Sequence, residues 1–519
     1  MRIIFLAILS VAGISLRAAT PAEDAAATMV VYNVNDPEAK GLADFYCASR
    51  GIDPSREIPL YAPLKEEISR DQYDTSIATP LRKELIRRGA WLVTLDMMNR
   101  PILYASTVRY VALIRGIPLK ISQCAEYPGD SRTQPDPHGG CNAASVDSEL
   151  SVLGLFSPQI SGTLLNPLYQ ESSPPKGEQG EGKTPPLGML FVSRLDAPAV
   201  EAVKTMIING IKAEKEGLWG WGYTDLRSVG TQGYERGNRW IKAAGEAMRK
   251  NGIPVITDDL SENIQSAFPV THPAAYYGWY AENIDGPFAH SDFRFVPGAV
   301  AVHLHSYTAS TLRDPKKGWT APLVTHGASA SLGNVYEPFL PFTTNLGVFA
   351  SALLEGRNLS ESYYYAQPVL SWMNVCVGDP LYRPYAAWYS PEPTSPSVWS
   401  DYRSIILAHG GDVMSAAADL KSRSEEKNES LYLEALGAAQ MDTGACADAE
   451  VSFKQAATFT KSPDIFFRLL LEQSRAIEKQ GRGNEAASLL KKYLSKETTA
   501  SRQALLESWI KRMETPTRN

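Results

Sequence analysis

Apolar residues follow two spacings along most of the chain. Short apolar runs predict strands, and apolar residues three and four positions apart predict helices. Strands are predicted at 29–32, 56–61, 108–121, 188–196, 253–259, 274–283 and 298–306, and helices at 36–51, 75–89, 198–217, 238–252 and 347–370. Residues 320–334 read as a helix followed by a strand. Because the strands lack regular in/out alternation, we expect an α/β fold with a mostly parallel sheet sandwiched by helices.

The pattern changes after residue 389. Residues 390–400 form a Pro/Ser-rich linker, and residues 401–519 read as helices throughout. Two segments of this tail align at an offset of 37, with Gly444 matching Gly481, Ala449 matching Ala486 and Phe453 matching Leu490. We therefore expect an α/β domain at 28–389 that folds without the tail, and a helical-repeat region at 401–519. An ordinary α-hairpin tail is the alternative.

The N-terminus has the layout of a secretory signal peptide. Arg2 is followed by an apolar core from Ile3 to Leu16 and by the small residues Ala18 and Ala19. We expect residues 1–18 to be a signal peptide and the protein to be exported, periplasmic or extracellular. A buried N-terminal helix is the alternative. No later segment is long and apolar enough to predict a membrane span.

Composition and charge narrow the classes of function. The 519 residues are 44% hydrophobic and 21% charged, which suits a globular protein with a large core. The net charge of -6 argues against a nucleic-acid partner, since such proteins carry a basic surface. No cofactor motif is present, so none is expected.

The five cysteines allow one disulfide prediction. Cys124 and Cys141 flank a polar loop, and an exported protein permits a bridge between them. Reduced cysteines that are merely near each other in sequence are the alternative, because connectivity cannot be read from sequence.

The segment from His303 to Arg313 concentrates the candidate chemistry. It follows an apolar strand, and ligands of parallel sheets bind beyond the carboxyl ends of strands. His303 and His305 would share one face of that strand, but two histidines alone under-ligate a metal, so no metal site is expected. Ser306 with a nearby histidine suggests a nucleophile, although no G-x-S-x-G turn is present. A histidine buried in the sheet beside a Ser/Thr-rich turn is the third interpretation.

Other predicted strand ends add polar and aromatic side chains. The candidate catalytic residues are His305, Ser306 and Glu337; the candidate binding residues are His303, Arg313, Arg194, Asp196, Trp279, Asn334 and Asp379. Two of these also have structural interpretations: Asp379 precedes a proline as a turn residue does, and Asp196 suits a helix cap.

Several motifs resemble an uncharacterised family of exported bacterial proteins. They include VVYNVNDPEAKGLADFYCASRGI, ASVDSEL, VSRLDAP, YYGWYAEN, HLHSYTASTLR and SWMNVCVGDPLYRPY, within roughly Thr28 to Tyr385. The family has no assigned activity, so the resemblance implies kinship and no chemistry.

A second resemblance is to the gingipain-type cysteine peptidases, which have a caspase-like α/β sheet. There, one strand ends in a His-Gly pair and the next in a Cys; here Trp279 stands in the first place, and His305 and Ser306 in the second. The resemblance therefore implies a caspase-like or flavodoxin-like sheet and a cleft at its edge, without cysteine protease activity. The tail, around Leu436-Gly437, Ala449 and Phe453, resembles tetratricopeptide repeats.

Two functions follow from these observations. One is a peptidase-like domain used for binding, joined to a repeat-like module that holds a protein or peptide partner. The other is an exported hydrolase with a non-cysteine active site at HLHSYT. The absent Cys–His pair favours the first, and the dense polar cluster favours the second.

Overall fold

The computed structural model of the protein describes residues 20–124, 142–155, 163–169, 171, 185–227, 232–390 and 397–515. The predicted signal peptide, most of the linker and Cys141 lie outside these residues, so the predicted cleavage, linker and disulfide stay predictions. No helix in the described part of the chain combines the length and apolar character needed to cross a bilayer.

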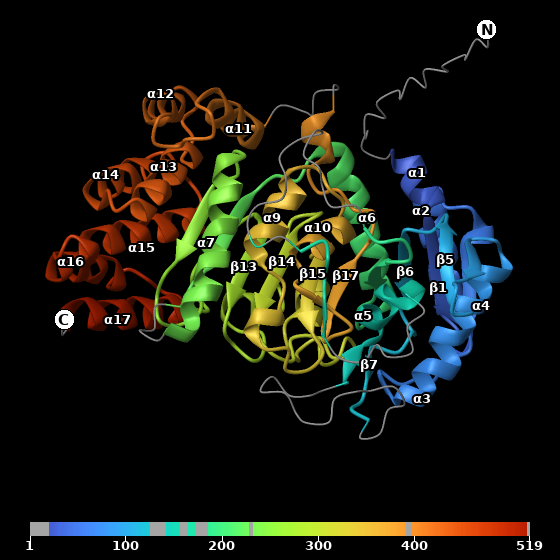
Figure 1. Ribbon diagram of the computed structural model, residues 1–519. Coiled ribbons are helices and arrows are strands. Elements are labelled where there is room, and N and C mark those ends of the chain that lie inside the picture. Colours follow the sequence, from blue (N-terminus) through green and yellow to red (C-terminus); the bar gives the residue numbers. More distant parts are fainter. Residues whose placement is uncertain are drawn as a thin grey trace, which may run out of the picture.

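A ten-stranded sheet forms the centre of the molecule (Figure 1). Its strands, in spatial order, are β12 (Val255–Asp258), β11 (Trp221–Asp225), β13 (Pro273–Trp279), β14 (Val300–Leu304), β15 (Ala330–Asn334), β17 (Asn374–Gly378), β10 (Phe191–Leu195), β6 (Tyr110–Ile114), β1 (Thr28–Asn33) and β2 (Glu57–Leu60). The strands from β12 to β15 pair in parallel, and so do β10, β6, β1 and β2. The predicted fold class, a mostly parallel α/β sheet followed by an all-helical region, is confirmed.

Strand β17 separates these two parallel groups. It is antiparallel to β15 over five residue pairs and meets β10 through one parallel pair, Arg194–Val377, a contact too short to set the direction of the β10 group; the contacts between loops described next set it. The antiparallel register places Asn374 beside Asn334, the last residue of β15, and Gly378 beside Ala330, the first. The end of β17 therefore lies at the edge of the sheet where β15 begins.

The parallel groups deliver their carboxyl ends to one common edge, called the carboxyl edge below. Arg313, which follows β14, forms an ion pair with Asp196, which follows β10. Glu66, which follows β2, accepts a hydrogen bond from the backbone N–H of Leu312 at 2.7 Å. Loops from distant strands therefore meet at this edge, as expected where ligands of α/β sheets bind.

Helices cover both faces of the sheet. Their bounds are α2 (Ala39–Arg50), α4 (Thr79–Arg87), α5 (Val146–Ser151), α6 (Val200–Glu216), α7 (Glu235–Lys250), α8 (Thr320–Thr325), α9 (Leu346–Leu354) and α10 (Leu359–Ala366). One apolar cluster joins α7, α9 and α10 to β13 and β14, and another joins α2, α6 and α8 to β1 and β17. A separate hairpin, β4 (Trp91–Leu95) with β5 (Pro101–Ser106), packs beside α4.

The C-terminal region consists of paired helices. They are α11 (Val398–Ala408), α12 (Ala417–Lys427), α13 (Leu431–Asp442), α14 (Cys446–Ala456), α15 (Pro463–Lys479), α16 (Gly483–Leu494) and α17 (Ala500–Glu514). Gly444 and Gly481, aligned in the sequence, both have positive φ, 80° and 78°, in the turns α13–α14 and α15–α16. Equivalent turns support the internal repeat, because a positive φ favours glycine.

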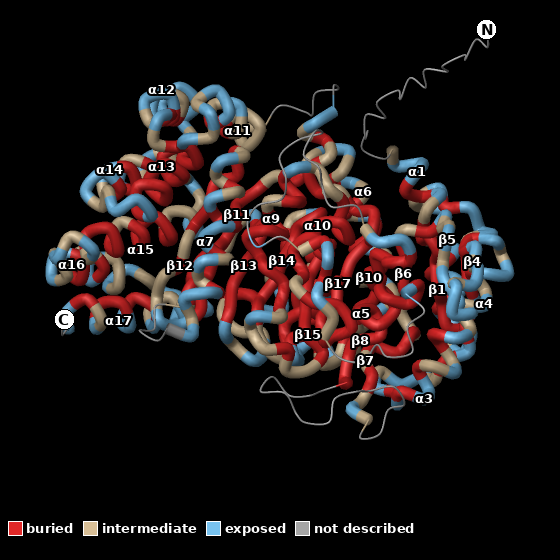
Figure 2. Tube along the Cα trace, viewed as in Figure 1, coloured by how far each residue is buried: buried red, intermediate tan, exposed pale blue. Residues whose placement is uncertain are grey.

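The helical region shares its core with the sheet. One continuous apolar cluster contains Trp221 and Tyr223 of β11, Ile256 of β12 and residues of α13, α15 and α17. Figure 2 shows α13 and α15 as buried and α16 as more exposed. The chain has no helix between β12 and β13, so the tail supplies the cover for this part of the sheet. Independent folding of residues 28–389 stays a prediction, although a chain without the tail would expose the part of this cluster that lies on β11 and β12.

Arg468 of α15 is the polar centre of this junction. Its side chain is fully buried and forms a two-bond ion pair with Glu434 of α13, at 2.6 and 3.0 Å. It also donates to the Tyr223 hydroxyl at 3.2 Å and to the Thr271 hydroxyl at 2.6 Å. Removing one partner of such a pair leaves a buried charge without compensation.

We predict that Arg468→Ala lowers the free energy of unfolding by about 3–5 kcal/mol, since Glu434 loses its counter-charge in the interior. The matched control is Arg482→Ala, which removes an exposed pairing with Glu450 and Glu485 and should cost at most about 1 kcal/mol. Urea unfolding followed by circular dichroism measures both. Equal, small losses would contradict the role given to Arg468 as the buried polar centre of this junction.

Candidate functional site

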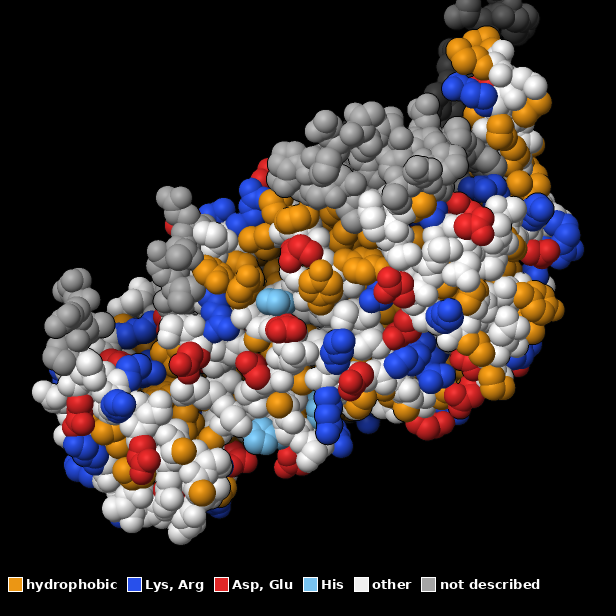
Figure 3. Space-filling view, turned by 90° about the horizontal axis from the view of Figure 1, so that it is seen from below, with side chains coloured by type: hydrophobic (Ala, Val, Ile, Leu, Met, Phe, Trp, Pro, Cys, Tyr) orange, Lys and Arg blue, Asp and Glu red, His pale blue; other side chains and the backbone are white. Residues whose placement is uncertain are grey.

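The three predicted catalytic residues, His305, Ser306 and Glu337, meet at the carboxyl edge. β14 ends at Leu304, directly before His305 and Ser306, and β15 ends at Asn334, three residues before Glu337. Figure 3 views the molecule from this edge and shows apolar side chains gathered beside a mixed field of acidic and basic ones. His305, Ser306 and Glu337, together with the nearby Tyr280 and Tyr307, are called the Ser306 surface below.

Ser306 is bound to a carboxylate. Its hydroxyl donates a hydrogen bond to one carboxylate oxygen of Glu337. The other carboxylate oxygen accepts the backbone N–H of Phe339 at 3.1 Å. The serine proton therefore points to Glu337 and is not held by a histidine.

His305 is turned away from the Ser306 hydroxyl. Its Nδ1 lies 2.8 Å from the carbonyl oxygen of Ser306, and a carbonyl can only accept, so Nδ1 carries the hydrogen. In the neutral ring Nε2 is then an acceptor, and no described residue donates to it. The ring meets Tyr280 edge-on, with centroids 4.8 Å apart. His305 thus offers an acceptor to a ligand.

Asn334 fixes the backbone of this turn. Its amide donates to the carbonyl of His305 at 2.8 Å and accepts from the amide of Asn374 at 2.8 Å. Its side chain is 4% exposed, so it acts on the site through the backbone of His305 and presents no free group to a ligand.

The backbone is strained on both sides of the Ser306–Glu337 contact. Tyr307 has φ 61°, and Phe339 has φ 61° with ψ 134°, a region that suits glycine. Strain of this kind costs about 1–3 kcal/mol per residue and persists where the surroundings enforce it, often at functional sites. Tyr307, 47% exposed, projects from such a position.

His303 lies inside the core beneath this surface. The backbone N–H of Ala281 donates to its Nε2 at 3.0 Å, so Nδ1 carries the hydrogen and donates to the Tyr276 hydroxyl at 2.9 Å. The ring stacks on Trp319 with centroids 3.6 Å apart. Burial lowers the pKa of His303 well below its usual range, and His305 and Arg227 lower it further. His303 is therefore a neutral residue of the core, with both nitrogens occupied.

The polar chain behind His303 ends at Asp225. The Tyr276 hydroxyl lies 3.2 Å from a carboxylate oxygen of Asp225, at the end of β11. Burial raises the pKa of Asp225. The carboxylate of Asp258, which pairs with Asp225 from the neighbouring strand β12, raises it further.

Arg194, Asp196 and Arg313 form a second, mostly buried group. Arg194 is fully buried, donates to Asp147 through Nε at 3.1 Å, and reaches Asp196 at 3.1 Å. Arg313 pairs with the opposite side of Asp196. The group ties α5, β10 and the loop after β14 together, which is a positioning arrangement.

The two remaining candidate binding residues lie elsewhere. Trp279 is 2% exposed and donates to Asn238 of α7 at 2.9 Å, on the other face of the sheet. Asp379 follows β17 and therefore lies at the opposite edge, where it accepts from Tyr46 at 2.7 Å and from Arg50. Asp379 does not reach the Ser306 surface, and Trp279 meets it only through an edge-on contact with the ring of Tyr280, with centroids 5.8 Å apart.

Tyr280 and Arg227 also contribute to this edge, and only Tyr280, one of the aromatic residues of YYGWYAEN, could be predicted from the sequence. Tyr280 is 46% exposed, and its carbonyl accepts from Arg227 at 2.9 Å. Within the described residues, no group of three or more His, Cys, Asp or Glu side chains is arranged to hold a metal ion.

Comparisons with known proteins add little to this geometry. No protein-family model and no curated protein matches the chain. A solved structure described as "Structure of Protease" is similar at 10% identity and a TM-score of 0.38, over 69% of this chain and 78% of the other. A likeness of that size carries no argument about activity.

We predict a pH dependence of stability that belongs to His303. Unfolded histidine titrates near pH 6.5, and the folded pKa is lower, so the unfolded state alone binds the proton below that pH. Stability should fall as the pH falls from 6.5, by up to about 1.4 kcal/mol per pH unit. His303→Gln should reduce this slope, and His272 and His326, whose pKa values burial also lowers, should account for what remains; His409→Gln in the tail should keep the wild-type slope. Urea unfolding at several pH values measures the slopes; a wild-type slope in His303→Gln would contradict the assignment.

Proposed function

We propose that the protein is an exported binding protein whose Ser306 surface holds a peptide without cleaving it. The observation that carries the proposal is the hydrogen bond from Ser306 to Glu337, with His305 turned to the serine carbonyl. Serine nucleophiles need a base on the hydroxyl, usually an imidazole, and a carboxylate is a far weaker base.

The exposed side chains suit a peptide. Tyr280 and Tyr307 supply large aromatic surfaces with few rotatable bonds, which favours recognition. Glu337 offers negative charge, and Nε2 of His305 offers an acceptor. The signal-like N-terminus supports export.

The helical tail would serve a partner only through its outer helices. α13 and α15 are buried almost throughout, against β12 and against α14 and α16. A protein partner of the tail would therefore contact the exposed faces of α11, α12, α14, α16 or α17.

A second candidate is a hydrolase at the same edge. The strained backbone at Tyr307 and Phe339 favours it, because strain clusters at catalytic turns. This candidate requires Ser306 to leave Glu337 and meet a base. The two candidates differ in the reactivity of the Ser306 oxygen.

We predict that the chain from residue 20 onward binds selected members of an array of capped decapeptides. Tyr307→Ala and Glu337→Gln should weaken those peptides about tenfold, because each removes a contact at the Ser306 surface. The matched control is Tyr61→Ala, which removes an exposed tyrosine outside this surface and should change nothing. Fluorescence anisotropy with the selected peptides measures the affinities. An equal loss in Tyr61→Ala, or no selective peptide, would refute the proposal.

A further inference from the structure

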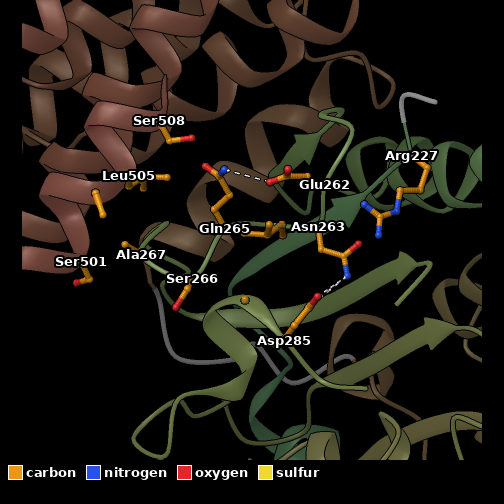
Figure 4. A pocket seen from close by; sticks show the side chains of 13 residues that line it. Arg227, Glu262, Asn263, Gln265, Ser266, Ala267, Asp285, Ser501, Leu505 and Ser508 are labelled. Carbon is orange, nitrogen blue, oxygen red and sulfur yellow. Dashed lines mark hydrogen bonds between the residues drawn. The ribbon is translucent and has the colours of Figure 1, made fainter. Parts of the chain in front are cut away.

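A cavity of about 620 Å³ lies between the sheet and α17. Its wall on the sheet side comes from the segments after β11, β12 and β13, and its other wall from α17 (Figure 4). It lies at the carboxyl edge, apart from the residues of the Ser306 surface.

The cavity contains more acceptors than donors can satisfy. Asp285 accepts from the amide nitrogen of Asn263 at 3.1 and 3.2 Å. Glu262 is exposed and accepts one long contact from Gln265, at 3.5 Å. Two carboxylates thus face the cavity with little compensation.

Asn263 provides a second indication of a ligand, independent of the two carboxylates. Its side chain is 8% exposed, and its amide oxygen has no hydrogen-bond partner among the described residues. The amide cannot be reversed, because its nitrogen donates to Asp285. A buried acceptor of this kind costs free energy until a donor reaches it.

The cationic group in the wall is already engaged. Arg227 donates to the carbonyls of Ser261 and Tyr280, at 2.8 and 2.9 Å. Burial raises the pKa of Asp285, as expected for a carboxylate short of positive charge, although Asn263 and Arg227 lower it. The apolar part of the wall, with Leu505, Ala504 and Ala267, suits an aliphatic stem.

We propose that this cavity binds the ammonium-bearing side chain of a lysine, with the stem against α17 and the N–H groups towards Asp285, Glu262 and Asn263. The proposal does not depend on the peptide-binding proposal for the Ser306 surface, because it uses other residues. Arg227 contacts the backbone carbonyl of Tyr280, and the ring of Tyr280 meets that of His305, so these residues connect the cavity wall to the Ser306 surface.

The test compares two small probes on the whole chain from residue 20. N-acetyl-lysine methylamide carries the ammonium group, and N-acetyl-norleucine methylamide has the same stem without it. The chain contains 5-fluorotryptophan, and Trp509→Phe identifies the signal of Trp509. This residue reports on the cavity, because its indole N–H donates to Gln265 in the wall at 2.6 Å.

The lysine probe should shift the Trp509 signal in a saturable way, and the norleucine probe should not. Asp285→Asn should weaken the lysine probe about tenfold. Glu262→Gln changes an exposed side chain, so it tests the same charge without risk to the fold and should weaken binding severalfold. The matched control is Glu282→Gln, an exposed acid outside the wall, which should bind as the wild type does.

Three results would overturn the proposal. They are equal binding of both probes, an equal loss in Glu282→Gln, and no lysine-dependent shift of Trp509. A shift produced by calcium chloride but not by the lysine probe would also overturn it, in favour of an inorganic ion. Each result leaves the Ser306 surface to be judged by its own variants.

Discussion

The burial of His303 sets the geometry on which the carboxyl edge depends. Its ring is held from one side by the backbone of Ala281, from the other by Tyr276, and from above by Trp319. These contacts hold the carboxyl ends of β13 and β14 in a fixed position relative to each other. The chain then leaves the sheet, so His305 and Ser306 emerge at the surface while His303 stays inside. A neutral, fully bonded histidine thus anchors the end of β14 in the core, directly before the residues that emerge at the surface.

The sheet in turn depends on the tail. β11 and β12 have no covering helix of their own on one face, and α13 and α15 fill that place with the same apolar cluster. Arg468, whose ion pair with Glu434 lies within the tail, also donates across the junction to the hydroxyls of Tyr223 and Thr271, so its hydrogen bonds are complete only when the tail is docked. The inner helices of the tail are therefore covered by the sheet of the same chain.

Much of the sheet could be predicted from periodicity. The predicted strand 298–306 corresponds to β14, and residues 320–334 form a helix and then a strand, as predicted. The predicted helix 347–370 breaks into α9 and α10, because Gly356 has positive φ and Asn358 caps a new helix. Ser306 and Glu337 both follow predicted strands, which indicated that they lie at the same edge of the sheet. Asp379 also follows a strand, but the antiparallel direction of β17, which takes it to the opposite edge, is set by long-range pairing. The burial of Arg468 could not be predicted either, since a charged helical residue looks like a surface residue until its partner helix is known.

The central claim is that Ser306 belongs to a binding surface and is not an activated nucleophile. Treating the chain from residue 20 with a fluorophosphonate, followed by intact-mass and peptide mass spectrometry, tests it most directly. The hydrogen bond to Glu337 predicts no modification of Ser306, with the same mass for the wild type and Ser306→Ala. Stoichiometric labelling at Ser306 that disappears in Ser306→Ala and in His305→Ala would contradict the account and establish a hydrolase.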